Sequence, residues 1–426
     1  MKRVLTVLLT TFLLVGAVSL SAQTTVNSMA MSAMNFTDET LAGLKALGIN
    51  LVHQENPYEG YREKLLADWS AGASSYDIVA VSDEWIADFV TPGYLTPLDA
   101  YFKKAPSSWE LSDFFETPIN LVARYPQGSG QLYTVPYLTF SLELAYNSKM
   151  FKDAGIVDAK GEAKPPKTLA EFTDACKKLT NPAKNLYAFA PLYLNGETVT
   201  IQYEHWHRVF TGLGGVLDAS NKPQVGNSGS VEALKFMKSI LQYSPPGALN
   251  YRDFEVTQAL KTGKVAMIFI WGAFGGDLSN PKDNPMAQYI KFAATPASPK
   301  TGKPAPMGAA WGWGIPKYAQ NKDISWKAIQ YLTSKDVLSK ELKHLATTYG
   351  AGPTRKSVFA SQQAMSSPWL VVQGQILPFT GYRPHLSEWT QISAIISDEV
   401  SAALSGTKDE KSAMDEAQQR IQALFK

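Results

Sequence analysis

The stretch that constrains the fold most strongly runs from Thr24 to Val81 and reads TTVNSMAMSAMNFTDETLAGLKALGINLVHQENPYEGYREKLLADWSAGASSYDIVAV. Its periodicity predicts, in order, a strand at 24–32, an amphipathic helix at 38–47, a strand at 49–54, a helix at 58–71 and a strand at 76–81. Gly48 follows the first helix directly, as is usual for a residue that ends a helix. Strands that alternate with helices are typical of a parallel sheet covered by helices, so this stretch indicates an α/β fold.

The loops that follow these strands are the first candidates for a binding site. Ligands of such sheets bind beyond the carboxyl ends of the strands. This rule selects residues 32–35, 55–57 and 82–85. The last loop holds Asp83, Glu84 and Trp85. We expect a carboxylate there to accept hydrogen bonds from a ligand and the indole to contact it. The alternatives are a helix cap for the acids and a core or rim position for the tryptophan.

Length and composition restrict the class of protein. A chain of 426 residues is longer than one hydrophobic core usually supports, so we expect two lobes. With 45% hydrophobic and 18% charged residues, the composition is that of a folded globular protein. The formal net charge is +2 and no basic run is present, which makes nucleic acid an unexpected partner.

The first residues have the pattern of a secretory signal peptide at 1–22. Met1-Lys2-Arg3 precede an apolar run at 4–18 and then small residues, with cleavage expected after Ser21 or Ala22. The apolar run is shorter than the roughly 20 residues that span a bilayer, so we expect a soluble, exported mature protein. Cys176 is the only cysteine, which excludes an intramolecular disulfide, and its helical surroundings predict a buried structural thiol.

The middle of the chain predicts a second α/β lobe. Residues 131–137 and 142–146 form two extended pieces separated by a polar and aromatic step, where the chain can cross between lobes. A helix is expected to start after Thr168 as N-cap, and further helices and short strands follow up to Trp271. The last part, 324–426, is mainly helical in pattern.

Several segments match one protein family in order and spacing. They are 76–79 with Trp85, Phe89 and 93–99; 130–136 followed by 145–151, Ala154-Gly155 and 165–168; 263–267 with Trp271-Gly272; 325–334; 353–355; and Arg383-Pro384 with Ser405-Gly406. In these segments the chain resembles the bacterial extracellular solute-binding proteins of family 1, the maltose-binding-like components of ABC importers. The resemblance runs from about residue 40 to the C-terminus.

The resemblance implies a two-lobed periplasmic-binding-protein (Venus-flytrap) fold of the α/β class, in which each lobe is a mainly parallel sheet flanked by helices and hinge strands join the lobes. By this analogy the chain crosses near residues 139–141, 291 and 340. The N-terminal lobe is then 23–139 with 291–340, and the C-terminal lobe is 140–290 with 341–426. The implied function is capture of a sugar or sugar alcohol by hinge closure and its delivery to the membrane permease of an ABC importer. We expect a monomer in the periplasm or another extracytoplasmic space, without a cofactor.

Sugar capture requires flat apolar faces for C–H surfaces and planar polar groups for hydroxyls. Trp271 and Phe274 lie in a glycine-rich segment, and Trp311 and Trp313 alternate with glycines, so that one of that pair is expected to face the cleft. The full set of predicted ligand-binding residues is Asp83, Glu84, Trp85, Tyr137, Trp271, Phe274, Trp311, Trp313, Arg355 and Arg383.

Three alternatives compete with this interpretation. His205 and His207 bind a metal together only on a strand, and no metal site is expected. An exported glycoside hydrolase would need paired carboxylates, such as Glu143 and Asp83, roughly 5 to 10 Å apart. The chain lacks the serine and zinc motifs of common hydrolases, so we do not expect an enzyme. A binding protein for polyamines, metal or peptides would have a strongly charged cleft.

Overall fold

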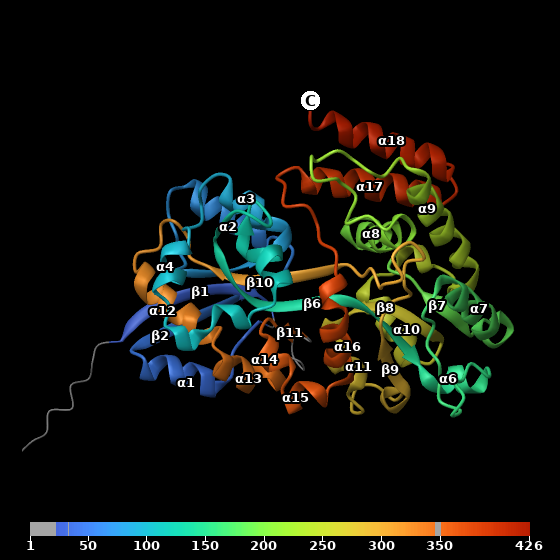
Figure 1. The fold of residues 1–426 in the computed structure, drawn as a ribbon, viewed down its shortest axis with the longest axis horizontal. Coiled ribbons are helices and arrows are strands. Elements are labelled where there is room, and N and C mark those ends of the chain that lie inside the picture. Colours follow the sequence, from blue (N-terminus) through green and yellow to red (C-terminus); the bar gives the residue numbers. More distant parts are fainter. Residues whose placement is uncertain (1–22, 33, 346–350) are drawn as a thin grey trace, which may run out of the picture.

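The computed structural model describes residues 23–32, 34–345 and 351–426, and the predicted signal peptide lies outside them. Helices surround two sheet regions that lie side by side, with strand β6 (Thr134–Asn147) running from one into the other (Figure 1). Within the described ranges no helix is both long enough and apolar enough to cross a membrane.

The N-terminal lobe begins with the predicted alternation of strands and helices. In order these are β1 (Thr24–Met31), α1 (Asp38–Ala46), β2 (Ile49–Asn56), α2 (Tyr61–Ser70) and β3 (Ile78–Ser82). Strand β1 pairs in parallel with both β2 and β3, and all five predicted elements are confirmed within a few residues of their expected ends. The sheet continues through β10 (Gly308–Gly314), which is antiparallel to β3 and to β6.

Strand β6 connects the two lobes without a break. Its first half pairs with β10, and its second half pairs with β8 (Val265–Trp271) and β9 (Ile290–Ala293). All 14 residues are buried. The predicted interruption near residue 139 is therefore wrong, because the polar side chains of Thr139 and Ser141 form hydrogen bonds within the core instead of marking a loop.

The C-terminal lobe is built on β7 (Tyr187–Ala190), which pairs in parallel with β8. Helix α7 (Leu169–Leu179) starts after Thr168, whose hydroxyl accepts a hydrogen bond from the Glu171 amide, as predicted for an N-cap. Cys176 is fully buried on this helix, and burial raises the pKa of its thiol. The helices that pack around this sheet are α8 (Glu197–Thr211), α9 (Ser228–Ile240), α17 (Trp389–Leu404) and α18 (Glu410–Ala423).

The two-lobed α/β architecture is as expected, but the sheets are mixed and not mainly parallel. Parallel pairing joins β1 to β2, β1 to β3 and β7 to β8. The pairings of β6 and β10 are antiparallel, because these strands carry the chain between lobes in opposite directions. The remaining helices and strands are α3 (Ile86–Val90), α4 (Asp99–Lys104), α5 (Glu116–Pro118), β4 (Arg124–Tyr125), β5 (Gln131–Leu132), α6 (Ser148–Asp153), α10 (Asp253–Lys261), α11 (Gly275–Ser279), α12 (Lys322–Leu332), α13 (Lys335–His344), β11 (Gly352–Pro353), α14 (Lys356–Phe359), α15 (Gln362–Met365) and α16 (Pro368–Ile376).

The hydrophobic cores support a revision of the predicted lobe boundaries. One cluster contains buried residues up to Phe140 together with 309–370, and a second contains residues from Leu144 to Phe269 together with 389–421. Strand β9 pairs with the second half of β6, so it belongs with the C-terminal lobe. We propose that the chain returns to the N-terminal lobe near Met307 and leaves it between Ile376 and Trp389. The helices α14 to α16 then belong to the N-terminal lobe.

A buried carboxyl group lies on β6 just past the crossing point. Both oxygens of Glu143 are buried and lack a hydrogen-bond partner in the described part of the chain. A side chain at Gly272 would place its Cβ 2.8 Å from Glu143 Oε1 and 3.3 Å from Gln373 Oε1, so it would displace the Glu143 carboxyl group. Burial raises the pKa of Glu143 well above its usual value. The folded protein therefore keeps this proton at a pH where the unfolded chain has lost it.

The substitution Glu143→Gln is expected to stabilise the protein by about 1–3 kcal/mol at pH 8 and by much less at pH 4.5. Since the folded-state pKa is the higher one, the wild type loses stability as the pH rises above the ordinary carboxyl pKa, and glutamine removes this loss. Thermal unfolding at both pH values tests this. The exposed control Glu232→Gln should change neither value. Equal destabilisation of Glu143→Gln at both pH values would contradict a neutral, buried carboxyl group.

Candidate functional site

A cavity of about 730 Å³ lies between the two lobes. Both lobes and the segment that connects them contribute to its walls. From the N-terminal lobe and β6 the lining residues are Met31, Ser32, Tyr58, Glu59, Ser82, Glu84, Phe140, Ala309 and Trp311; from the C-terminal lobe they are Leu192, Leu194, Asn195, Glu197, Thr198, Ile201, Arg252, Asp253, Trp271, Ala273, Phe274 and Asp277; and Arg383 comes from the connecting segment. Ser32, Tyr58 and Glu84 follow the carboxyl ends of β1, β2 and β3, as the parallel-sheet rule predicts.

The loop after β3 places its three predicted residues in different environments. Glu84 lines the cavity. Asp83 is buried behind the wall, where it accepts a hydrogen bond from the Ala310 amide at 3.0 Å. Trp85 is also buried, and its ring lies 5.1 Å from the ring of Tyr58 and 5.6 Å from that of Tyr61. Trp85 therefore supports Tyr58 from behind, and of these three aromatic residues Tyr58 is the one that lines the cavity.

Arg383 joins carboxylates from both lobes. Its Nε lies 2.6 Å from Glu197 Oε1 and 3.9 Å from Glu84 Oε2, and its Nη1 lies 3.2 Å from Asp83 Oδ2. Burial raises the pKa of Asp83 to about 6 even though the Arg383 charge lowers it. The planar guanidinium suits several carboxylates at once, so this side chain holds the N-terminal lobe against the start of α8.

The wall from the C-terminal lobe carries the predicted aromatic residues Trp271 and Phe274. Trp271 ends β8 and meets Phe140 nearly edge-on, with ring centroids 5.5 Å apart. A Cβ at Gly275 would lie 2.2 Å from the indole of Trp369, so only glycine lets this segment lie against α16. The glycine-rich sequence thus fixes where the two aromatic side chains enter the cavity.

Trp311 and Trp313 have different surroundings. The ladder between β10 and β6 is irregular between Trp311 and Gly312. Trp311 lines the cavity and packs edge-on against Trp85. Trp313 is fully buried, with ring centroids 5.8 Å from Tyr137 and 5.9 Å from Phe36. Trp313 and Tyr137 therefore lie in the core of the N-terminal lobe and do not line the cavity.

Arg355 also lies away from the cavity, in contrast to the prediction. Its guanidinium donates hydrogen bonds to the carbonyl oxygens of Thr333, Trp109 and Glu110 at 2.7 to 3.0 Å. It forms an ion pair with Asp113 at 3.4 Å and is fully buried. These contacts use the N–H donors of the guanidinium group, so the Arg355 side chain stabilises the N-terminal lobe.

Several lining residues were not among those predicted. Glu197 opens α8, Asp253 opens α10, and Asp277 lies on α11, where it pairs with Lys261 at 2.5 Å. Tyr58 and Glu59 directly follow the predicted 55–57 loop, because β2 extends to Asn56 and the loop after it runs from Pro57 to Gly60. Nothing in the local sequence marks Glu197 or Asp253, because only the packing of the lobes brings them to the cavity.

The histidine pair and the carboxylate pair do not form sites of their own. His205 and His207 lie on α8 and have separate partners, the Ala305 carbonyl and the Gly215 carbonyl with Ser230. Burial lowers the pKa of His205 to about 3 and that of His207 to about 4. No group of three or more metal-binding side chains occurs among the described residues. Neither Glu143 nor Asp83 lines the cavity, so these two carboxylates do not face a common substrate.

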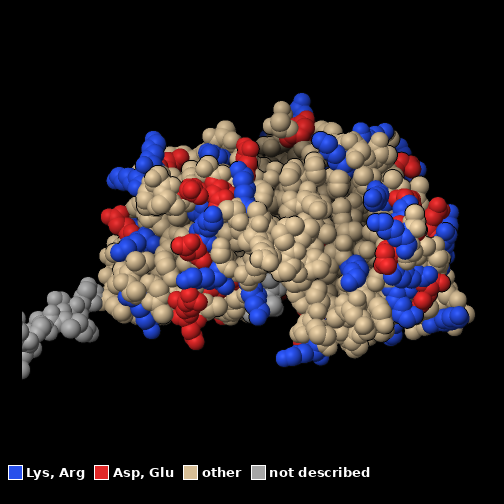
Figure 2. Space-filling view, turned by 60° about the horizontal axis from the view of Figure 1, so that its bottom comes forward, with Lys and Arg blue, Asp and Glu red and all other residues tan. Residues whose placement is uncertain are grey.

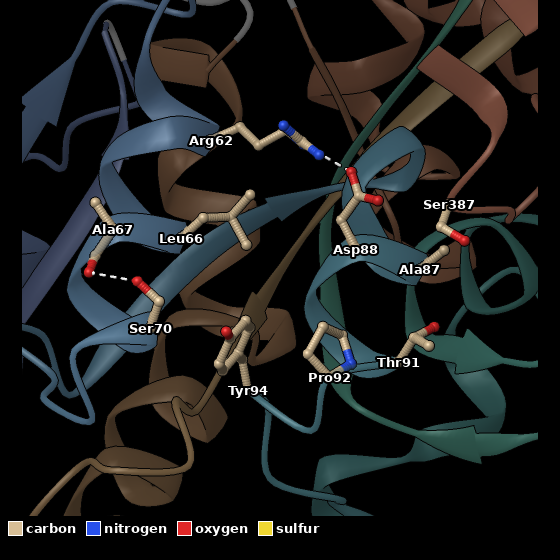
Figure 3. A pocket seen from close by; sticks show the side chains of 10 residues that line it. All are labelled: Arg62, Leu66, Ala67, Ser70, Ala87, Asp88, Thr91, Pro92, Tyr94 and Ser387. Atoms are coloured by element: carbon tan, nitrogen blue, oxygen red, sulfur yellow. Dashed lines mark hydrogen bonds and ion pairs between the residues drawn. The ribbon is translucent and has the colours of Figure 1, made fainter. Parts of the chain in front are cut away.

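A smaller hollow of about 460 Å³ lies on the N-terminal lobe between α2 and α3 (Figure 3). Arg62 pairs there with Asp88 at 2.6 Å, and the Ser70 hydroxyl donates to the Ala67 carbonyl at 3.0 Å. Its other walls are mostly small or aliphatic, so it offers few free polar groups. The larger cavity, with aromatic and charged residues from both lobes, is therefore the candidate site.

One face of the molecule carries charges of both signs. Figure 2 shows basic and acidic residues interspersed over both lobes, with mostly uncharged residues between them. This face therefore carries no extended basic surface.

Residues 37–338 match the family model of the bacterial extracellular solute-binding proteins. A probable amino-acid ABC transporter periplasmic-binding protein of Sinorhizobium fredii is 26% identical over 94% of this chain and 86% of its own length. The structure is also similar to an ABC transporter solute-binding protein of Agrobacterium radiobacter in complex with ribitol, with a TM-score of 0.77, 23% identity and coverage of 94% of this chain and 98% of that chain. A solute-binding protein of Thermotoga lettingae bound with alpha-D-tagatose gives a TM-score of 0.78, 24% identity and coverage of 95% and 100%.

Proposed function

Because this chain belongs to the bacterial extracellular solute-binding proteins, we propose that it captures a sugar or sugar alcohol between its lobes and delivers it to the permease of an ABC importer. The observation that carries this proposal is the lining of the cavity. Tyr58 and Trp311 from one lobe and Trp271 and Phe274 from the other offer flat apolar faces. Carboxylates between them accept hydrogen bonds from hydroxyl groups.

The mechanism follows from the connections between the lobes. A ligand that touches both walls stabilises the closed arrangement by the difference between its affinities for the closed and open forms. Strand β6 and the segment around Arg383 pass between the lobes and act as the hinge in this proposal. The protein works as a monomer outside the cytoplasm, and it releases its ligand to the permease unchanged.

The ligands named for similar structures support a carbohydrate as the ligand of this chain. The two similar structures hold ribitol and alpha-D-tagatose, both polyhydroxylated and uncharged. The similar protein from Sinorhizobium fredii is named as a probable binding protein of an amino-acid transporter. An amino acid brings a carboxylate that needs a free cation, and Arg383 is already surrounded by three carboxylates. The cavity therefore favours the carbohydrate.

A thermal-shift screen of the protein from Gln23 onward tests the proposal. A ligand that binds only the folded state stabilises that state, by about 2.7 kcal/mol when its concentration is a hundred times its Kd. This stabilisation raises the melting temperature. We expect a rise with one class of sugars or polyols, and chromatography should recover that compound unchanged. A rise with amino acids, polyamines or metal salts, with none for any carbohydrate, would overturn the proposal.

A further inference from the structure

The charge of the cavity points to a narrower class of ligand. Its lining contains five acidic side chains, Glu59, Glu84, Glu197, Asp253 and Asp277, and two basic ones, Arg252 and Arg383. Asp83 lies directly behind this wall, within 3.2 Å of Arg383. Carboxylates in a cleft with low-dielectric walls produce a negative potential that attracts cations and repels anions. The lining is therefore acidic as well as aromatic.

The buried cations of this region are not free to receive an anion. Arg383 is enclosed by Asp83, Glu84 and Glu197. Lys261 is bound to Asp277. Arg252 is exposed, at the start of α10, where water competes for its contacts. A phosphate or carboxylate group in the cavity would face the excess of carboxylates without a buried partner, which costs affinity.

One acidic group of the lining takes part in no ion pair. Asp253 lines the cavity, forms no ion pair with an arginine or lysine among the described residues, and interacts with its own backbone amide. The neighbouring backbone amide of Arg252 donates to Glu255 and not to Asp253. The aromatic walls Trp271 and Phe274 line the same cavity, and their ring faces also attract cations.

We infer that the cavity selects a polyhydroxylated ligand that carries an amino group, with Asp253 as the acceptor for its ammonium, and that it rejects analogues carrying phosphate or carboxylate. This inference rests on the proposed function and narrows its ligand class. A neutral sugar uses the same aromatic walls but leaves the Asp253 carboxylate without a cationic partner.

Isothermal titration with two matched series tests the inference. The first series is D-glucitol, 1-amino-1-deoxy-D-glucitol and D-gluconate, and the second is D-glucose, D-glucosamine and D-glucose 6-phosphate. In each series we expect the amine to bind at least about 10-fold more tightly than the neutral compound, and the anion at least about 10-fold more weakly, each a difference of about 1.4 kcal/mol. Raising the salt from 50 to 500 mM should narrow both differences.

Two variants link this preference to Asp253. The substitution Asp253→Asn should reduce the amine-to-neutral affinity ratio to below about 3-fold, since it removes the charge that receives the ammonium. The control Asp38→Asn, an exposed acid at the first position of α1, should leave the ratio unchanged. Equal affinities within each series, or an unchanged ratio in Asp253→Asn, would overturn the inference while the carbohydrate proposal stands. If no neutral or amino compound binds here or in the thermal-shift screen, both proposals fall together.

Discussion

Replacement of Arg383 by methionine is expected to lower the free energy of unfolding by about 3–5 kcal/mol, the usual cost of removing one partner from a buried ion pair. The guanidinium is 6% exposed and is the cation that Asp83, Glu84 and Glu197 share. Without it, Asp83 stays fully buried, and the Ala310 amide is the one hydrogen-bond partner that it keeps among the described residues. Urea unfolding at pH 7, followed by tryptophan fluorescence, measures this loss.

A matched control and a rescue separate this effect from a general cost of losing an arginine. Arg420 is 39% exposed, and its partner Glu399 keeps a second contact with Lys408 at 2.5 Å, so Arg420→Met should cost no more than about 1 kcal/mol. Adding Asp83→Asn to Arg383→Met should restore part of the stability, because it removes the buried charge. The loss should also be smaller at pH 5, since Asp83 already has a pKa of about 6 with Arg383 present. Equal, small losses for both arginine variants would show that the network is not stabilising.

The sequence predicted best those features that depend on neighbouring residues. The five elements from Thr24 to Ser82 follow from hydrophobic periodicity and from glycines at helix ends, and the structure has all five. The rule for carboxyl ends of parallel strands then led to Glu84, and the glycines beside Trp271 and Phe274 led to the other wall. Each of these signals is local, so one sequence is enough to detect it.

Features that depend on distant segments were not predicted. Arg355 is surrounded by carbonyl groups from residues 109, 110 and 333, which no pattern around residue 355 reveals. The helices α14 to α16 pack their apolar side chains into the hydrophobic cluster of the N-terminal lobe, although the family resemblance implied that residues 341–426 belong to the other lobe. Asp253 resembles an ordinary first residue of a helix until the cavity beside it is known. In each case the decisive contact joins residues far apart in the sequence.

The substitution Trp271→Ala is expected to weaken binding of the carbohydrate that gives the largest thermal shift by about 10- to 100-fold, which is about 1.4–2.8 kcal/mol. The indole is partly exposed in the cavity and its place is fixed by β8 and by Phe140. Alanine removes the flat face that covers the C–H surface of the sugar and leaves that surface in contact with water. Isothermal titration of the variant and the wild type measures the change.

The controls for Trp271 distinguish loss of a binding surface from loss of folding. Phe254, on α10 beside Asp253, is 65% exposed and does not line the cavity, so Phe254→Ala should leave the affinity unchanged. Trp271→Phe keeps a smaller aromatic face and should retain an intermediate affinity. This order, with wild type binding most tightly and alanine most weakly, requires that the ring itself contacts the ligand, because a variant that merely loosened the fold would affect binding and melting temperature together. An unchanged affinity in Trp271→Ala would place the ligand elsewhere in the cavity and leave Trp311 and Tyr58 as its aromatic contacts.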